Sequence, residues 1–132
     1  MRIDNQPSTQ SAALDSHIAR TSRCRVLVIG TTEAVEQSLA GLMPYLDTPV
    51  RCWSPDAPLP APGDVNTLVI RDVEVLTVER QRELLSWLEE AVARTRVVST
   101  TTVPLFQRVT AGLFLDTLYY RLNTVTLGGV DR

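Results

Sequence analysis

Short runs of β-branched and aliphatic residues alternate with helical segments along the chain, and this alternation limits the possible folds more than any other feature. The run at 25–29 ends at Gly30 and is followed by apolar residues at helical spacing. Similar runs at 67–71 and 96–100 are also followed by helical segments. Such unbroken runs indicate strands that are buried on both faces. The chain is therefore predicted to be an α/β protein with three layers, α-β-α, and a mainly parallel sheet.

The same periodicities place the other elements. The proline-rich link, residues 54–63, has four prolines in ten residues and is expected to lack regular structure. Trp53, just before this link, would either contact a partner or close the edge of the sheet. The helix that begins at 33 is expected to kink or end at Pro44. Strands are expected at 25–29, 49–53, 67–71, 96–100 and 124–127, and further helices at 78–93, 104–110 and 114–122.

Length and charge restrict the class of protein. A chain of 132 residues has room for one domain, which is expected over 24–132. Residues 1–23 are polar with few apolar side chains, so a flexible N-terminal leader is expected there. All 13 basic residues are arginine, which excludes chemistry that needs a lysine. The net charge of -2 gives no support for direct DNA binding, because proteins that bind phosphate backbones carry a basic face.

The cysteines and the hydropathy pattern give further expectations. Cys24 and Cys52 lack the spacing of a metal site, and the single histidine, His17, lies in the leader, so no metal is expected. No segment approaches the roughly 20 apolar residues that a membrane-spanning helix needs, and no signal-peptide pattern begins the chain. The protein is therefore expected in the cytoplasm, without membrane contact.

Three segments of the second half resemble, in order and spacing, the AAA+ domain of sigma-54-dependent transcription activators. Residues 67–90 are similar to Thr-Leu-Phe-Leu-Asp-Glu-Ile followed by Gln-x-x-Leu-Leu-x-x-Leu-x-Glu, and Gln81 is one of the identical positions. Residues 96–105 look like the strand Arg-Ile-Ile-Ala-Ala-Thr-Asn-Arg-Asp-Leu. Residues 112–125 are similar to Gly-Arg-Phe-Arg-Glu-Asp-Leu-Tyr-Tyr-Arg-Leu-Asn-Val-Val. The run Leu-Tyr-Tyr-Arg-Leu-Asn is the most specific of these signals.

The resemblance implies a P-loop NTPase-like core and identifies the positions of the family's nucleotide site. Val35 and Glu36 stand where the phosphate loop has a glycine and its lysine, and Arg71 stands where the family has the aspartate that holds magnesium. Glutamate repels a triphosphate, and arginine does not ligate a metal ion. The chain is therefore predicted not to be an enzyme and to bind no ATP or other cofactor. The degenerate site positions are Gly30, Val35, Glu36, Arg71, Asp72 and Thr102.

The resemblance also implies that two parts of the family are missing. No Gly-Ala-Phe-Thr-Gly-Ala occurs between Gly30 and Asp72, so the loop with which relatives grip sigma-54 is expected to be absent. The chain ends before the position of the helical lid subdomain. These features predict a reduced AAA+ core.

The predicted function is that of a catalytically inactive sigma-54-activator-like core that acts as a protein-interaction or regulatory module in bacterial transcription control. Its expected partner is a protein, either an intact AAA+ activator or a second copy. In the family, two arginines reach the neighbour's nucleotide; Leu115 replaces the first, and Arg121 matches the second. The candidate interface residues are Phe114, Leu115, Tyr119, Tyr120, Arg121 and Asn123.

Three alternatives stay open at the level of the sequence. The chain could be a non-hydrolysing nucleotide- or anion-binding sensor that uses Gly30, Arg71 and Arg121. Residues 25–42 also resemble the opening of a response-regulator receiver domain, in which two threonines would replace the acidic pair. Thirdly, the domain could be a structural piece of an unrelated complex. For Arg71, an ion pair with Glu74 or Glu36 competes with any ligand-binding role.

Overall fold

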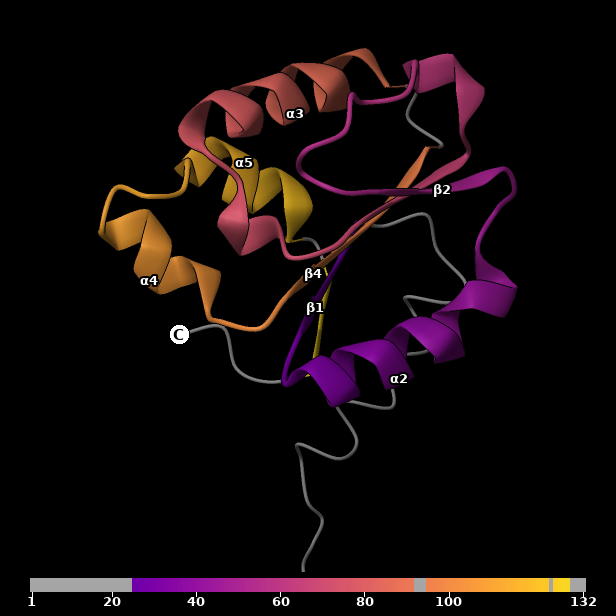
Figure 1. Ribbon diagram of the computed structural model, residues 1–132, viewed down its shortest axis with the longest axis horizontal. Helices are drawn as coiled ribbons and strands as arrows, with labels where there is room; N and C mark the ends of the chain where they lie inside the picture. Colours follow the sequence, from indigo (N-terminus) through magenta and orange to yellow (C-terminus); the bar gives the residue numbers. More distant parts are fainter. Residues whose placement is uncertain (1–24, 92–94, 124, 129–132) are drawn as a thin grey trace, which may run out of the picture.

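The computed structural model describes residues 25–91, 95–123 and 125–128 (Figure 1). Within them, five strands form one sheet in which all neighbouring pairs are parallel. The strands are β1 (Val26–Ile29), β2 (Val50–Trp53), β3 (Thr67–Ile70), β4 (Arg96–Thr101) and β5 (Val125–Gly128). The helices are α2 (Thr32–Leu42), α3 (Val78–Glu90), α4 (Leu105–Thr110) and α5 (Asp116–Leu122), with 3-10 turns η1 (Met43–Tyr45), η2 (Pro62–Asp64) and η3 (Val73–Val75). The predicted leader at 1–23 lies outside the described residues.

The strand order is β2-β3-β4-β1-β5, and it confirms the predicted parallel α/β fold. It also tests the receiver-like alternative that the sequence left open. A receiver domain has the order 2-1-3-4-5, in which the first strand lies beside the second. Here β1 lies between β4 and β5, so the receiver-like alternative is wrong.

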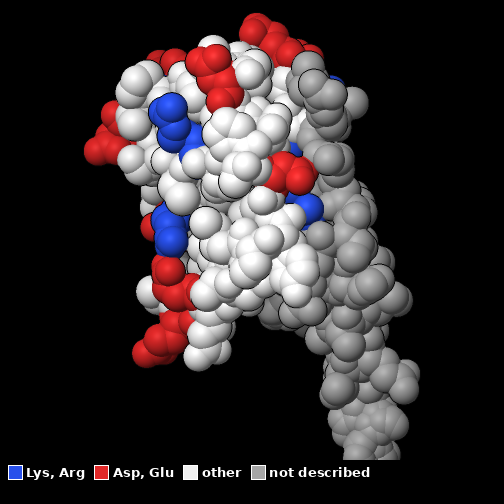
Figure 2. All heavy atoms as spheres, turned by 90° about the vertical axis from the view of Figure 1, so that its right-hand side faces the viewer, with Lys and Arg blue, Asp and Glu red and all other residues white. Residues whose placement is uncertain are grey.

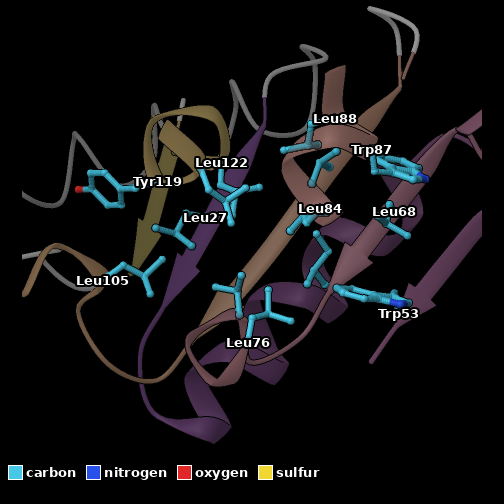
Figure 3. Packing of buried hydrophobic residues seen from close by; sticks show 14 of the residues in the cluster. Leu27, Trp53, Leu68, Leu76, Leu84, Trp87, Leu88, Leu105, Tyr119 and Leu122 are labelled. Carbon is cyan, nitrogen blue, oxygen red and sulfur yellow. The ribbon is translucent and has the colours of Figure 1, made fainter. Parts of the chain in front are cut away.

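Helices cover both faces of the sheet, as a three-layer fold requires (Figure 1). Successive residues of a strand point to opposite faces. Accordingly, Val26 and Val28 of β1 belong to the apolar cluster with α2, whereas Leu27 and Ile29 belong to the cluster with α3, α4 and α5. Figure 3 shows the second cluster, in which leucines of the strands meet leucines and aromatic rings of the helices. The strands β1, β3 and β4 are thus buried on both faces of the sheet.

Local sequence explains the bounds of α2. The hydroxyl oxygen of Thr31 accepts a hydrogen bond from the backbone N–H of Ala34 at 3.2 Å and caps the helix. Val35 and Leu39 then face the sheet at helical spacing. The helix ends at Leu42, and Pro44 lies in the 3-10 turn that follows, which confirms the predicted end.

The first part of the proline-rich link is held by side-chain donors. The Trp53 indole N–H donates to the carbonyl of Ala57 at 2.8 Å, and the Arg80 Nε–H donates to the carbonyl of Pro55 at 2.8 Å. The Arg80 guanidinium also lies 5.3 Å from the centroid of the Trp53 ring, within the range of a cation–π contact. Trp53 is only 3% exposed, so it closes the edge of the sheet and does not offer a ring to a partner.

The second part of the link departs from the prediction of no regular structure. Its end forms the 3-10 turn η2, which begins at Pro62 with the proline in the first turn. Proline suits this position because it supplies no N–H and its φ angle is already helical. Just before the turn, the carbonyl of Pro60 accepts a hydrogen bond from the indole N–H of Trp87 on α3.

Gln81 joins α3 to the start of α5. Its side-chain NH2 donates to the carbonyls of Leu76 and Leu113, both at 3.0 Å. Its side-chain oxygen accepts from the backbone N–H of Leu115 at 2.8 Å. Gln81 is fully buried, so these bonds satisfy a polar group that burial would otherwise penalise. The resemblance to the family at Gln81 therefore has a structural explanation.

Candidate functional site

The first candidate site lies where β1, β3 and β4 end. In parallel α/β sheets, ligands bind at the carboxyl ends of strands, next to the point where successive helices leave on opposite faces. Here α2 leaves β1 on one face, whereas the chain leaves β4 toward α4 on the other (Figure 1). Gly30 lies at this point, and its N–H donates to the carbonyl of Thr101 at 3.2 Å. A side chain at Gly30 would come within 3.1 Å of the Ala34 methyl, so the turn favours glycine.

Glu36 and Arg71 form an ion pair at this end of the sheet. Both guanidinium Nη atoms of Arg71 donate to the two carboxylate oxygens of Glu36. These hydrogen bonds lower the pKa of Glu36 and raise that of Arg71. The residues at the family's lysine and aspartate positions therefore contact each other with their charges exchanged. Of the two acids that the sequence offered to Arg71, the structure selects Glu36.

Replacing Glu36 by glutamine is expected to lower stability at neutral pH and to have less effect in acid. Because the pKa of Glu36 is lowered in the folded state, the unfolded chain binds this proton more readily. The contribution of the pair is therefore present above the usual glutamate pKa of about 4.3 and is lost as the pH falls through the lower folded value. Both side chains are about half exposed, so the effect is small.

Urea unfolding of the wild type and of Glu36→Gln, measured between pH 7 and pH 3, checks this expectation. The two midpoints should converge as the pH falls. Midpoints that differ by the same amount over the whole range would show that the ion pair is not the cause.

The remaining site positions are engaged in local structure. Asp72 has the left-handed backbone conformation, with φ 54°, and its N–H donates to the hydroxyl of Thr100 at 3.0 Å. The hydroxyl of Thr102 donates to Glu74 at 3.0 Å. Val35 lies on the buried face of α2 and faces the core. Glu36, Arg71, Asp72 and Thr102 thus lie at one end of the sheet, while Val35 presents no group to it.

The second candidate site is the predicted interface, and the structure divides its residues. Phe114 and Tyr119 are 3% and 7% exposed, so they belong to the core and do not line a surface. Leu115 and Asn123 are half-buried, whereas Tyr120 and Arg121 are exposed. The Tyr119–Tyr120 pair therefore has one ring inside and one outside. Phe114 and Tyr119 were wrongly included in the interface, because the turn before α5 takes Phe114 inward and the face of α5 that meets the sheet takes Tyr119 inward.

Two exposed side chains join this surface that the sequence analysis did not single out. The α4–α5 surface consists of Phe106, Leu113 and Tyr120, which are 38%, 57% and 68% exposed. The rings of Phe106 and Tyr120 flank the ring of Tyr119, at centroid distances of 6.3 and 5.1 Å from it. Leu113 follows Gly112, whose φ of 77° makes the sharp turn between the helices. In the sequence, Gly112 is the residue that indicates an exposed turn before α5.

Arg121 lies away from the first site. Its guanidinium is 3.6 Å from Glu89 near the end of α3, and its carbonyl is 3.5 Å from the Arg25 guanidinium, which precedes β1. Gly30 and Arg71 are at the opposite ends of the strands. The structure therefore does not bring together Gly30, Arg71 and Arg121, the set required by the anion-sensor alternative.

On the side of the domain that carries the β2 edge, the exposed charges of the described residues do not form a basic face (Figure 2). In Figure 2, the arginine side chains on the side of the domain that carries the β2 edge are separated from one another, and acidic side chains lie near them. Within the described residues, no group of three or more histidine, cysteine or acidic side chains could hold a metal ion. None of the described helices is long and apolar enough to cross a membrane.

The sequence matches the model of a protein family. The model described as "Sigma-54 interaction domain" matches residues 60–128, which is more than half of the chain. The chain belongs to the Sigma-54 interaction domain family. The match covers β3, α3, β4, α4, α5 and β5, and it includes the segments on which the sequence resemblance rests. A search of curated proteins found no match for this Sigma-54 interaction domain.

Solved structures support the fold of this Sigma-54 interaction domain. NtrX from Brucella abortus in complex with ATP is similar with a TM-score of 0.69 and 16% identity, over 96% of this chain and 36% of that one. The P-loop NTPase domain of a sigma-54 activator from E. coli is similar with a TM-score of 0.66 and 18% identity, over 95% and 96% of the two chains. Domain III of DnaA from Thermotoga maritima has a TM-score of 0.57 and 15% identity, over 97% and 65%. These similarities confirm the P-loop NTPase-like core.

The prediction that the Sigma-54 interaction domain is not an enzyme needs correction. It rested on single substitutions in the motifs, above all Glu36 and Arg71. The chain belongs to the Sigma-54 interaction domain family and shares the fold of a P-loop NTPase domain, and substituted positions alone do not show that activity is lost. The absence of ATP binding is untested by these findings and stays a prediction.

Proposed function

We propose that this Sigma-54 interaction domain is a protein-interaction module in sigma-54-type transcription control, and that the α4–α5 surface contacts its partner. The observation that carries the proposal is the exposure of three large apolar side chains, Phe106, Leu113 and Tyr120, on neighbouring segments. Exposed aromatic and aliphatic residues beside charged ones are typical of protein contact sites. The candidate partners are an intact activator of the family and a second copy.

The charge around this surface supports a protein partner. Arg121 follows Tyr120 directly in α5 and forms an ion pair with Glu89 of α3. An apolar centre with charged groups at its edge is the usual arrangement of a protein interface. The chain spans 36% of the length of NtrX. A role in transcription control like that of a complete activator is therefore part of this proposal.

The double variant Leu113→Ser, Tyr120→Ser is expected to weaken association at least tenfold. Both changes remove apolar surface that a partner would cover, and buried aromatic contacts at the centre of an interface each contribute about 2 kcal/mol or more. Sedimentation velocity of the chain alone, and of the chain mixed with NtrX, measures self-association and complex formation separately.

The matched control is Met43→Ser, Tyr45→Ser on η1, where the side chains are 43% and 50% exposed. It removes a similar apolar area from a different surface and is expected to leave association unchanged. If both double variants sediment like the wild type in the presence of a bound partner, the α4–α5 surface is not the contact site.

A further inference from the structure

Arg25 and Arg121 form an arginine pair at the amino-terminal end of β1. Arg25 precedes this strand, and Arg121 lies in the last turn of α5. One Nη atom of Arg25 lies 3.5 Å from the carbonyl oxygen of Arg121 and donates to it. The pair is separated along the sheet from Glu36 and Arg71, which lie at the carboxyl ends of the strands.

Within the part of the chain that the structure describes, the arginine pair has fewer carboxylate partners than guanidinium groups. Among the described residues, the one carboxylate in ion-pair contact with it is Glu89, 3.6 Å from Arg121. Arg25 is half-buried, and burial together with the positive charge of Arg121 lowers its pKa. Both effects disfavour the charged form of Arg25. A second anion at this position would relieve the repulsion between the two guanidinium groups.

The surroundings favour a carboxylate as that anion. A guanidinium group presents a planar set of donors that matches the two oxygens of a carboxylate. Tyr120 precedes Arg121 in α5, and both side chains are exposed. A protein that covers Tyr120 lies within reach of the neighbouring Arg121.

We propose that Arg25 and Arg121 bind an acidic side chain of the protein partner. The inference rests on the proposed function, since it names the chemistry of the partner at the edge of the same surface. The partner then carries an apolar side chain for Tyr120 next to a carboxylate for the arginine pair.

The position of Glu89 gives this proposal an unusual consequence. Its carboxylate competes with the partner for Arg121, so its removal frees the guanidinium group. Exposed ion pairs contribute about 0.2–1 kcal/mol, which corresponds to a gain in affinity of up to about fivefold for Glu89→Gln. A merely structural role of Glu89 would give no gain.

The test uses the full chain and a hexaglutamate peptide as the probe. The Nε–H resonances of the arginines are followed by NMR while the peptide is added, and the dissociation constant is measured at low salt. The resonances of Arg25 and Arg121 are expected to shift together, and Arg25→Gln and Arg121→Gln are each expected to weaken binding at least fivefold. Arg82→Gln, which removes an exposed arginine from α3, is the matched control and should leave binding unchanged.

Equal losses from all three arginine variants would overturn the proposal, because they would show a response to net charge alone. A weaker affinity of Glu89→Gln would overturn it as well. The proposed function is tested independently by the sedimentation of the Leu113→Ser, Tyr120→Ser variant. That variant can lose association while the Nε–H resonances of Arg25 and Arg121 do not shift when the peptide is added. In that case the proposed carboxylate site is wrong and the proposed interface is retained.

Discussion

Replacing Trp87 by alanine is expected to lower the free energy of unfolding by about 4 kcal/mol, the middle of the range for large aromatic residues in a core. The ring is 5% exposed and packs in the cluster with Leu68 and Leu88 (Figure 3). Its indole N–H donates to the carbonyl of Pro60 at 2.6 Å, so the same residue also holds the proline-rich link. The loss of the ring leaves a cavity and removes this hydrogen bond.

A second variant separates the two contributions. Trp87→Phe keeps most of the apolar volume and leaves the Pro60 carbonyl without its donor, which is expected to cost about 1–2 kcal/mol. The control Leu113→Ser changes an exposed side chain and should alter stability by less than about 0.5 kcal/mol. Urea unfolding measures all three. Equal losses for the alanine and phenylalanine variants would contradict the packing account of this position.

Gln81→Met is expected to lower the free energy of unfolding by about 3 kcal/mol. Methionine has nearly the same volume, but it makes none of the three hydrogen bonds of Gln81. The carbonyls of Leu76 and Leu113 and the N–H of Leu115 then lose their partner, and each buried unsatisfied group costs about 1–3 kcal/mol. Part of this cost is recovered where the loop relaxes toward water.

Two measurements test this prediction. Urea unfolding gives the loss of stability, and hydrogen exchange at the Leu115 amide reports whether the bond from α3 to the start of α5 is the one that is lost. Gln37→Met, an exposed position on α2, is the matched control and is expected to have little effect. An unchanged stability of Gln81→Met would mean that its hydrogen bonds contribute little to the joining of the two helices.

The secondary structure was predictable because it depends on local spacing. The helix expected at 78–93 spans Val78–Glu90, and the strand expected at 96–100 spans Arg96–Thr101. In each segment the apolar residues keep a single spacing from one end to the other. In addition, Thr77 caps the start of the helix. The expected and observed bounds of these two elements therefore differ only at their ends.

The contacts of the candidate site were less predictable, because they join residues that are distant in the sequence. The sequence offers both Glu36 and Glu74 as partners of Arg71, which lies 35 residues from Glu36. Strand order decides between them, since it brings the start of α2 to the end of β3. Glu74 instead accepts a hydrogen bond from Thr102.

The predicted interface shows a different limit. A motif marks Phe114 and Tyr119 together with Tyr120, but it does not say which face of a short helix meets the sheet. In α5, the buried positions are Leu118, Tyr119 and Leu122, and the turn before them takes Phe114 inward. The exposed residues Phe106 and Leu113 lie outside the most specific run of the motif. Only the packing of α4 against α5 identifies the surface.

Site-specific photo-crosslinking tests the central claim, that the α4–α5 surface contacts a protein partner, most directly. A photoreactive phenylalanine is placed at Tyr120 in one protein and at Tyr45 in another, and each is irradiated alone and with NtrX. The account predicts a crosslinked species, to NtrX or to a second copy, from position 120 and none from position 45. Crosslinks from position 45 without any from position 120 would contradict it.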